Sequence, residues 1–270
     1  MAQISAEYVR AFSAQLEALN KSAGKVIFTE EKRRLLTQRI IDGEADAFDE
    51  VETLMRQICG TYTRLSSALT CHFYDGIRQG ANVPGEFKAQ QYEQYDREAL
   101  RATSRACAAE VAQGKNTVPL PELLSGIASR EIRVSSERTV RSNIRHDPSK
   151  PKYCIVPGAG ACAFCQMRAS LGYQYDNSSK IESHNGCTCV ATPVFRGQKV
   201  QGYDPKIYLD RYDKANDLRM AVKNGSKEYD EELQRRIQIA KDNHAAKTDE
   251  PWRATNETLI IMRYQQGLSS

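Results

Sequence analysis

The chain has 270 residues, which is enough for one large domain or two small ones. Its 38 Lys and Arg residues against 34 Asp and Glu residues give a formal net charge of only +4, which excludes a protein that coats nucleic acid through bulk charge. Hydrophobic residues make up 40% of the chain, slightly below the usual globular share, so we expect a modest core and long, well-solvated helices.

The first 146 residues are predicted to form a helical domain. Apolar residues recur at helical spacing over residues 4–22, 30–41, 44–79, 86–113 and 119–145. The segment 44–79 carries a seam at alternating steps of three and four, and the coiled-coil-like pattern predicts one long helix in a bundle, with a parallel self-dimer as the alternative. The seam residues are Phe48, Val51, Met55, Ile58, Tyr62, Leu65, Leu69 and His72.

Five arginines mark one side of the predicted helix at residues 119–145. At 100° per residue they project onto an arc of about 140°. Such a stripe is typical of a solvated face, but arginine also binds carboxylates and phosphates through two parallel hydrogen bonds. The stripe is therefore also a candidate for contact with DNA or with a partner protein. Its residues are Arg130, Arg133, Arg138, Arg141 and Arg145.

The pattern changes after a linker that contains Pro148 and Pro151. Residues 153–203 combine glycines, β-prone runs and cysteines, with a short helix expected from Cys165 to Leu171 and a strand over 188–195. Residues 204–270 are predicted as a helical tail with helices at 205–223, 226–246 and 252–266. The expected fold class is mainly α, with a helical N-terminal domain (1–146), a small zinc-knuckle α+β region (153–203) and a helical tail (204–270).

Cysteine usage points to a metal site. The N-terminus has no secretory signal and no apolar run approaches the about 18 residues of a membrane span, so we expect synthesis in a reducing cytosol, where clustered cysteines favour metal over disulfides. Five of the eight cysteines lie within residues 154–189. The core pattern is Cys162-x2-Cys165, then 18 residues, then His184-x2-Cys187-x-Cys189. Two close ligand pairs joined by a loop are what a tetrahedral Zn²⁺ requires.

Five donors compete for four positions around such an ion. Cys162 and Cys165 are the strongest candidates, His184 follows, and either Cys187 or Cys189 completes the set, with the other as a neighbouring contact. Four protein ligands leave no open position for water, so the zinc is predicted to be structural. Buried reduced thiols without metal, and a catalytic metal, are the alternatives. Cys154 is a reserve ligand, and the remaining thiols are predicted core residues: Cys59, Cys71 and Cys107.

The arrangement of residues does not favour an enzyme. A zinc deaminase has a His-x-Glu before its Cys pair, whereas here the pair comes first and His184 precedes Asn185 and Gly186. A zinc-containing nuclease of the His-Asn type would need further ligands, and only Glu182 and Asp176 are close in sequence. We therefore expect no enzymatic activity, with such a nuclease or a DNA-binding regulator as the alternative functions.

The cysteine motif resembles the zinc-finger-like motif of the phage Mu F-type minor head proteins, and is similar to the branch found in tailed phages and prophages of actinobacteria. A second, softer match is the segment 73–78 (FYDGIR), followed by Pro84 and Gly85. Many members have His-Pro-Asn-Cys-Arg-Cys where this chain has His-Asn-Gly-Cys-Thr-Cys, so the ligand atoms match but a contact by that Arg is not carried over. The matching motif residues are Cys162, Cys165, Ala169, Gly172, His184, Cys187, Cys189 and Pro193.

This resemblance implies a minor capsid or head morphogenesis protein that acts at the portal or the inner capsid surface, in head assembly, DNA packaging or ejection. It implies the portal protein or the major capsid protein as partner, and packaged DNA as a further one. Neither a membrane nor a small-molecule substrate is expected. The protein is expected to be made in the bacterial host cytoplasm and to lie inside the virion head near the portal.

Overall fold

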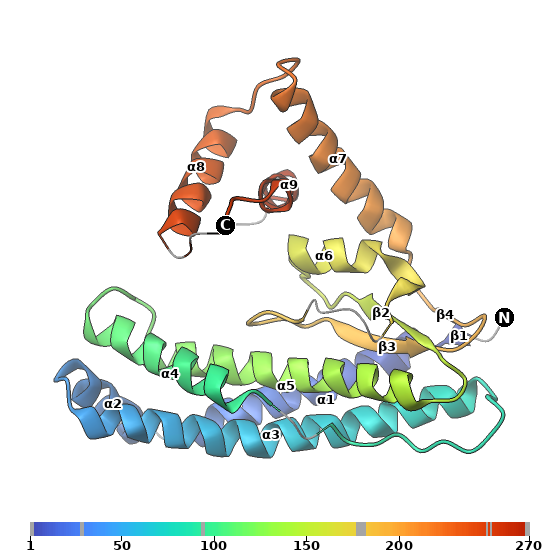
Figure 1. Ribbon diagram of the computed structural model, residues 1–270, viewed down its shortest axis with the longest axis horizontal. Coiled ribbons are helices and arrows are strands. Elements are labelled where there is room, and N and C mark those ends of the chain that lie inside the picture. The colour runs from blue at the N-terminus through green and yellow to red at the C-terminus, as the bar shows by residue number, and fades with distance from the viewer. Residues whose placement is uncertain are drawn as a thin grey trace.

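The computed structural model describes residues 3–27, 30–92, 95–176, 182–246, 248 and 250–267, and it confirms a mainly helical fold (Figure 1). The N-terminal helices form an elongated bundle along one side of the molecule. Contacts of Ser66 with Ile132 and of Tyr74 with Asp147 show that the third and fifth helices run in the same direction. The bundle helices are α1 (Ala6–Ile27), α2 (Glu30–Ile41), α3 (Ala45–Gly80), α4 (Arg97–Ala112) and α5 (Leu120–His146).

The predicted helix at residues 86–113 is wrong in its first part. Residues 86–92 are extended, and α4 begins only at Arg97, after the capping side chain of Asp96. Bundle side chains satisfy the backbone N–H groups of the extended segment: Ala89 donates to Asp75, and Gln90 donates to Asn143. Because these bonds replace the i−4 carbonyls that a helix would use, the extended path is stable against α3 and α5.

The predicted seam of α3 is confirmed at its start and wrong at its end. Val51, Met55 and Ile58 are buried, but Leu65 is 46% exposed and His72 also faces solvent. A straight helix has 3.6 residues per turn, so a strict 3.5-residue seam drifts by about 20° per heptad. The buried side therefore moves to small polar residues in the second half of the helix, and these are Thr63, Ser66, Ser67 and Thr70.

A pair of antiparallel strands follows the bundle. Strand β2 (Lys152–Val156) pairs with β3 (Val190–Val194), with Lys152 opposite Val194 and Val156 opposite Val190. The loop between them contains α6 (Ala163–Ser170) and a 3-10 turn (Gly172–Gln174). Two short strands that the sequence did not predict, β1 (Gln3–Ile4) and β4 (Lys199–Val200), pair in parallel and attach the N-terminus to this region.

The helical tail packs against α6. It consists of α7 (Pro205–Lys223), α8 (Glu231–Ala245) and α9 (Ala254–Gln265), which together form the upper part of the molecule in Figure 1. Its core contains Leu233, Ile237 and Met262, and Ala163 of α6 joins this cluster. Helix α8 starts later than predicted because Asp230 caps it by accepting from the N–H of Leu233. Within the described residues, no helix is both long and apolar enough to cross a membrane.

Candidate metal centre

The strand pair brings the two halves of the cysteine motif together. Strand β2 leads into the loop that carries Cys162 and Cys165, and β3 begins directly after Cys189. Since Val156 pairs with Val190, the two chain segments leave the sheet side by side. Cys162 occupies the N-cap position of α6, and Cys165 lies in the first turn of that helix. The favourable field of that helix terminus reaches both thiol groups.

All five predicted donors converge on one place. The Nε2 atom of His184 lies 3.1 Å from the Sγ atom of Cys162 and 3.2 Å from that of Cys165. The Sγ atoms of Cys165 and Cys187 are 3.6 Å apart. Two overlapping triads result, Cys162–Cys165–His184 and Cys165–Cys187–Cys189, with the donor atoms of each within 4.8 Å of one another. Cys165 belongs to both triads and so lies at the centre of the cluster.

These separations fit a tetrahedral zinc ion. With Zn–S bonds of about 2.3 Å and Zn–N bonds of about 2.05 Å, the edges of a tetrahedron are about 3.8 Å between sulfurs and about 3.6 Å between sulfur and nitrogen. The Cys165–Cys187 separation of 3.6 Å and the sulfur–nitrogen separations of 3.1 and 3.2 Å lie within about half an ångström of these values. The donor set of soft thiolates and one imidazole is also the set that zinc prefers.

Backbone N–H groups favour the charged form of three thiols. The N–H of Cys165 helps to lower the pKa of Cys162, that of Cys189 helps to lower the pKa of Cys187, and that of Gly158 opposes the raising of the pKa of Cys189. Such contacts stabilise sulfur in the charged form that binds metal. Gly158 is required for the last contact, because a Cβ atom there would lie 2.7 Å from the carbonyl oxygen of Thr188.

The orientation of His184 is fixed from outside the cluster. Its Nδ1 atom lies 2.7 Å from the carbonyl oxygen of Asn185, and since a carbonyl can only accept, Nδ1 carries the proton. The lone pair of Nε2 then faces the thiols, as in a metal-binding histidine. Without metal, the hydrogen bond with Cys162 raises the pKa of His184 to about 9.

The thiols influence one another strongly. The hydrogen bond from Cys165, helped by His184, lowers the pKa of Cys162 to about 3, and the bond from Cys165 also lowers the pKa of Cys187. The contact with Cys165 lowers the pKa of Cys189, but the bond to Cys187 and burial outweigh it and raise the value to about 12. A cluster in which some thiols ionise at neutral pH and share protons with the others is ready to bind a cation.

The other cysteines lie outside the two triads. Cys154 is buried in β2, and burial raises its pKa. Burial also raises the pKa of Cys59 to about 12 and that of Cys71 to about 11. The predicted reserve role of Cys154 therefore has no support from the geometry, and Cys59 and Cys71 are core thiols as predicted. Cys107, on α4, is half-buried.

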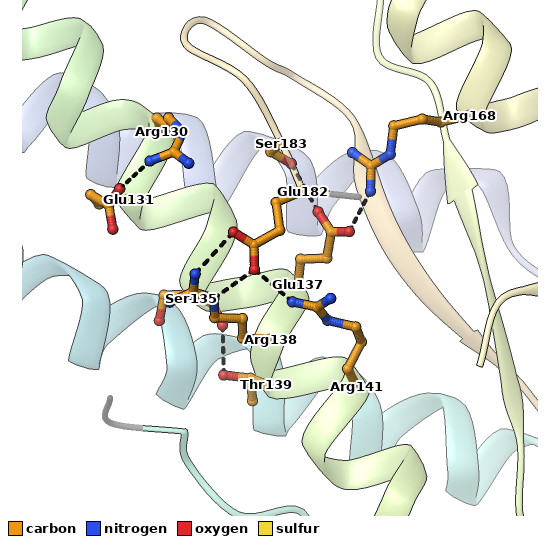
Figure 2. A network of polar contacts seen from close by, with 10 residues as sticks. All are labelled: Arg130, Glu131, Ser135, Glu137, Arg138, Thr139, Arg141, Arg168, Glu182 and Ser183. Carbon is orange, nitrogen blue, oxygen red and sulfur yellow. Dashed lines mark hydrogen bonds and ion pairs between the residues drawn. The ribbon is translucent and has the colours of Figure 1, made fainter. Parts of the chain in front are cut away.

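The arginine stripe of α5 contacts the cysteine loop, as Figure 2 shows. Arg138 binds both carboxylate oxygens of Glu182, at 2.7 and 2.9 Å, and Arg141 binds one of them at 2.8 Å. Glu182 lies two residues before His184. The arginine stripe thus holds the second half of the metal motif in place. The sequence did not predict this contact.

A buried acid on the same helix holds both halves. Glu137, 2% exposed, forms an ion pair with Arg168 and accepts a 3.1 Å hydrogen bond from the hydroxyl of Ser183 (Figure 2). Arg168 lies three residues after Cys165, and Ser183 directly precedes His184. We refer to the contacts of α5 with the cysteine loop as the α5 clamp. Its residues are Glu137, Arg138, Arg141, Arg168, Glu182 and Ser183.

The remaining arginines of the stripe have separate environments. Arg130 pairs with the neighbouring Glu131 at 2.6 Å. Arg145 is exposed at the end of α5, beside an open hollow of about 340 Å³ that Tyr92, Arg138, Arg141, Ser142 and His146 also line. Arg133 is only 2% exposed, so it cannot meet a ligand at the surface in this conformation. Arg145 is therefore the most open of the five to a partner, while Arg130, with a side chain 41% exposed, is partly open at the other end of the stripe.

Comparison with known proteins places the chain in a family. The model of the VG15 protein family matches residues 3–215, which run from β1 into α7 and include the bundle and the whole metal centre. No match was found among curated proteins or among solved structures. Because the family match covers most of the chain, the chain belongs to the VG15 protein family, a family of phage gene products.

Proposed function

We propose that this phage protein is a structural component of the virion head, a minor capsid or head morphogenesis protein. It would act at the portal or the inner capsid surface, in head assembly, DNA packaging or ejection, inside the head that forms in the host cytoplasm. The observation that carries this proposal is the closed donor cluster between bundle and tail, with the motif of Cys162, Cys165, His184, Cys187 and Cys189. The narrower assignment to the Mu F-type minor head proteins rests on that motif alone, because the VG15 family match supports only a phage protein.

Zinc at this cluster would have a structural role. When bound, it supplies strong bonds between the loop after β2 and the loop before β3, and such bonds can replace a hydrophobic core in a small region. The chain's own residues orient the donors: Asn185 fixes the imidazole, and the α5 clamp holds the segments on either side. With four protein donors or more available, the centre offers no position for a reacting water.

The surroundings also argue against the nuclease alternative. Such an enzyme needs a base or a further ligand beside its histidine. Both carboxylate oxygens of Glu182 accept hydrogen bonds from arginines, and His184 faces thiols. The two donor triads found among the described residues consist of cysteines and one histidine, without a carboxylate. This composition supports a structural protein over an enzyme.

A contact with DNA or with a capsid partner is best located at the far end of the arginine stripe. Arg145 and His146 border the open hollow there, and Tyr92 offers an aromatic face. Guanidinium groups and an aromatic ring suit phosphates and bases, and they suit acidic protein surfaces as well. The alternative of a free DNA-binding regulator predicts duplex binding that weakens with salt and is reduced when the exposed Arg145 is replaced.

The test has two steps. Protein purified without chelator should contain about one zinc per chain, and it should bind a purified portal ring or capsid shell from the same phage. Less than about half a zinc per chain would contradict the metal centre, and absence of binding to both assemblies would contradict the head role. A metal-dependent nucleic-acid cleavage assay with His184→Ala as control distinguishes a structural protein from a nuclease. Cleavage that this substitution abolishes would favour the nuclease.

A further inference from the structure

Arg133 is a buried charge with too few partners. It lies in the middle of α5 and is 2% exposed. Its Nη2 atom donates one long hydrogen bond, 3.5 Å, to the carbonyl oxygen of Ser13 on α1, and among the described residues no hydrogen-bond acceptor contacts its Nε or Nη1 atoms. A buried guanidinium without a counter-charge is costly, so its presence requires an explanation.

A second buried arginine of this protein, Arg168, has the carboxylate partner that Arg133 does not have. Arg168 is also buried, but Glu137 forms an ion pair with it, and the chain thereby supplies a carboxylate. Arg133 has no such acid. Glu17 is the carboxylate that attracts it, yet the Glu17 side chain is 49% exposed and binds Lys21 at 3.2 Å. Solvent and the lysine both weaken that attraction.

The other anions near Arg133 are thiolates. Ser13, which accepts the long bond from Arg133, donates its hydroxyl to the carbonyl oxygen of Thr188 at 3.3 Å. Thr188 is the residue between Cys187 and Cys189, so the guanidinium lies behind the loop that carries both thiols. The charges of Cys187 and Cys189 attract it and oppose the lowering of its pKa by burial.

A zinc–thiolate centre would carry the missing negative charge. Zn²⁺ with three thiolates and one neutral imidazole has a net charge of −1, and with four thiolates it has −2. In a low-dielectric interior such a charge is stabilised by a nearby cation, and a cation is stabilised by it in return. The free-energy cost of burying an unpaired guanidinium and that of burying an anionic metal centre offset each other when both groups are present.

We propose that Arg133 is the counter-charge of the metal–thiolate centre: it strengthens zinc binding from behind the Cys187–Cys189 loop without contacting the metal. The inference rests on the metal centre of the proposed function. Arg133 is a positioning residue in this role. It also explains why one arginine of the stripe is buried while the others form surface or clamp contacts.

The test compares zinc affinity with stability in the metal-free state, in the full-length chain. Arg133→Met keeps the length of the side chain and removes the charge, whereas Arg133→Lys keeps the charge. Arg145→Met removes the same charge from the exposed end of α5 and is the matched control. Zinc affinity is measured by competition with a chromophoric chelator, and stability by denaturant unfolding after metal removal.

We expect Arg133→Met to weaken zinc binding about 10- to 100-fold, the range for residues behind metal ligands, with Arg133→Lys recovering most of it and Arg145→Met unchanged. The metal-free Arg133→Met protein should be at least as stable as the metal-free parent. The cobalt-substituted forms should have the same thiolate-to-metal absorption bands, because the ligands are unchanged.

Three results would overturn the inference. If Arg133→Met binds zinc as tightly as the parent, Arg133 is not the counter-charge of the metal centre. A metal-free Arg133→Met chain that is unfolded or clearly less stable assigns Arg133 to packing alone. A parent protein that binds no zinc removes the metal centre itself, and this outcome is distinguishable from the first, in which the parent binds and only Arg133 is irrelevant.

Discussion

Helices α3 and α5 lie side by side along the bundle, but two stretches of their interface use different chemistry. At the end near α2 and α4, the contact consists of aliphatic side chains such as Met55, Ile58 and Leu124. In the middle of α3, hydroxyl groups replace them, before buried apolar side chains such as Phe73 and Ile77 return. In this polar stretch Thr70 donates to Ser136 at 2.8 Å, and further hydroxyl contacts join Ser66 to Ile132, Ser67 to Thr139 and Ser135 to Thr63.

The difference teaches where register matters in this protein. Burial of apolar surface is non-directional, so the aliphatic contacts near α2 and α4 constrain the register of the two helices less specifically. Hydrogen bonds have defined distances and angles and fix the helices relative to each other. The polar stretch is also where Glu137, Arg138 and Arg141 must meet the cysteine loop. A fixed register there places the α5 clamp beside the metal ligands.

Removing the thiol shared by both triads should loosen the polar stretch and the cysteine loop beside it, and should leave the apolar end near α2 and α4 intact. In Cys165→Ser we expect zinc to fall from about one per chain to below about a tenth, because neither triad is complete and metal binding drives folding of such regions. Hydrogen exchange should quicken at residues 182–189 and in α6, while the first half of α3 stays protected. Cys107→Ser is the control, and zinc retained in Cys165→Ser would contradict the site.

The buried acid of the α5 clamp should matter more than any surface charge. Glu137→Gln leaves Arg168 without its anion in a buried place, and we expect a loss of about 3–5 kcal/mol in the free energy of unfolding. Denaturant unfolding of the metal-loaded protein measures it. Glu122→Gln, at the exposed start of α5, should change the value little. If the two substitutions behave alike, the clamp does not stabilise the fold.

The close approach of Gly158 to the backbone of Thr188, in the loop that carries the metal ligands, gives the next largest expected loss of stability. Gly158→Ala would place a Cβ atom 2.7 Å from the carbonyl oxygen of Thr188, and since a backbone atom is in the way, we expect a loss of about 2–3 kcal/mol in the free energy of unfolding. Gly80→Ala has no heavy atom within 4 Å of the added carbon and should be nearly neutral. Equal stability of the two variants would show that the loop can move aside.

The stability contributed by Asp147, at the junction between α5 and β2, should depend on pH. Asp147 accepts from Tyr74 and Arg78 of α3, both at 3.1 Å, and from the N–H of Ser149 at 2.9 Å. Burial raises its pKa, but the bonds from Ser149, Tyr74 and Arg78 outweigh this and lower it below 3.8. A lowered carboxyl pKa stabilises the fold above the ordinary value, and this contribution disappears as the pH falls through the lower, folded value.

We therefore expect Asp147→Asn to cost about 1–2 kcal/mol at pH 7, since the bonds to a charged acceptor are weakened. The gap between variant and parent should shrink as the pH is lowered below 3.8, the ordinary pKa of the group. Thermal or denaturant unfolding across pH 2 to 7 measures it. Asp213→Asn, exposed on α7, should follow the parent at every pH, and a gap that widened in acid would contradict the assignment.

Sequence alone predicted the metal motif well because its information is local. Cys162 and Cys165 form one turn and His184 to Cys189 form another, so spacing defines both halves, and the five donors do converge. The α5 clamp could not be predicted, because Glu137 and Arg168 are far apart in the chain and each is an ordinary helical residue. Helical periodicity likewise located α2 and α7 but not the extended residues 86–92, whose backbone partners are distant side chains.

The seam of α3 offers a last test of the comparison, and it includes the smallest expected effect, that of Leu65→Ala. Periodicity treats Met55 and Leu65 as equivalent seam positions, whereas Met55 is buried and Leu65 is 46% exposed. Met55→Ala should cost about 2–5 kcal/mol, the range for a buried large-to-small change. Leu65→Ala should cost less than about 0.5 kcal/mol in the free energy of unfolding, because nearly half of the side chain is already in water and no core contact is lost.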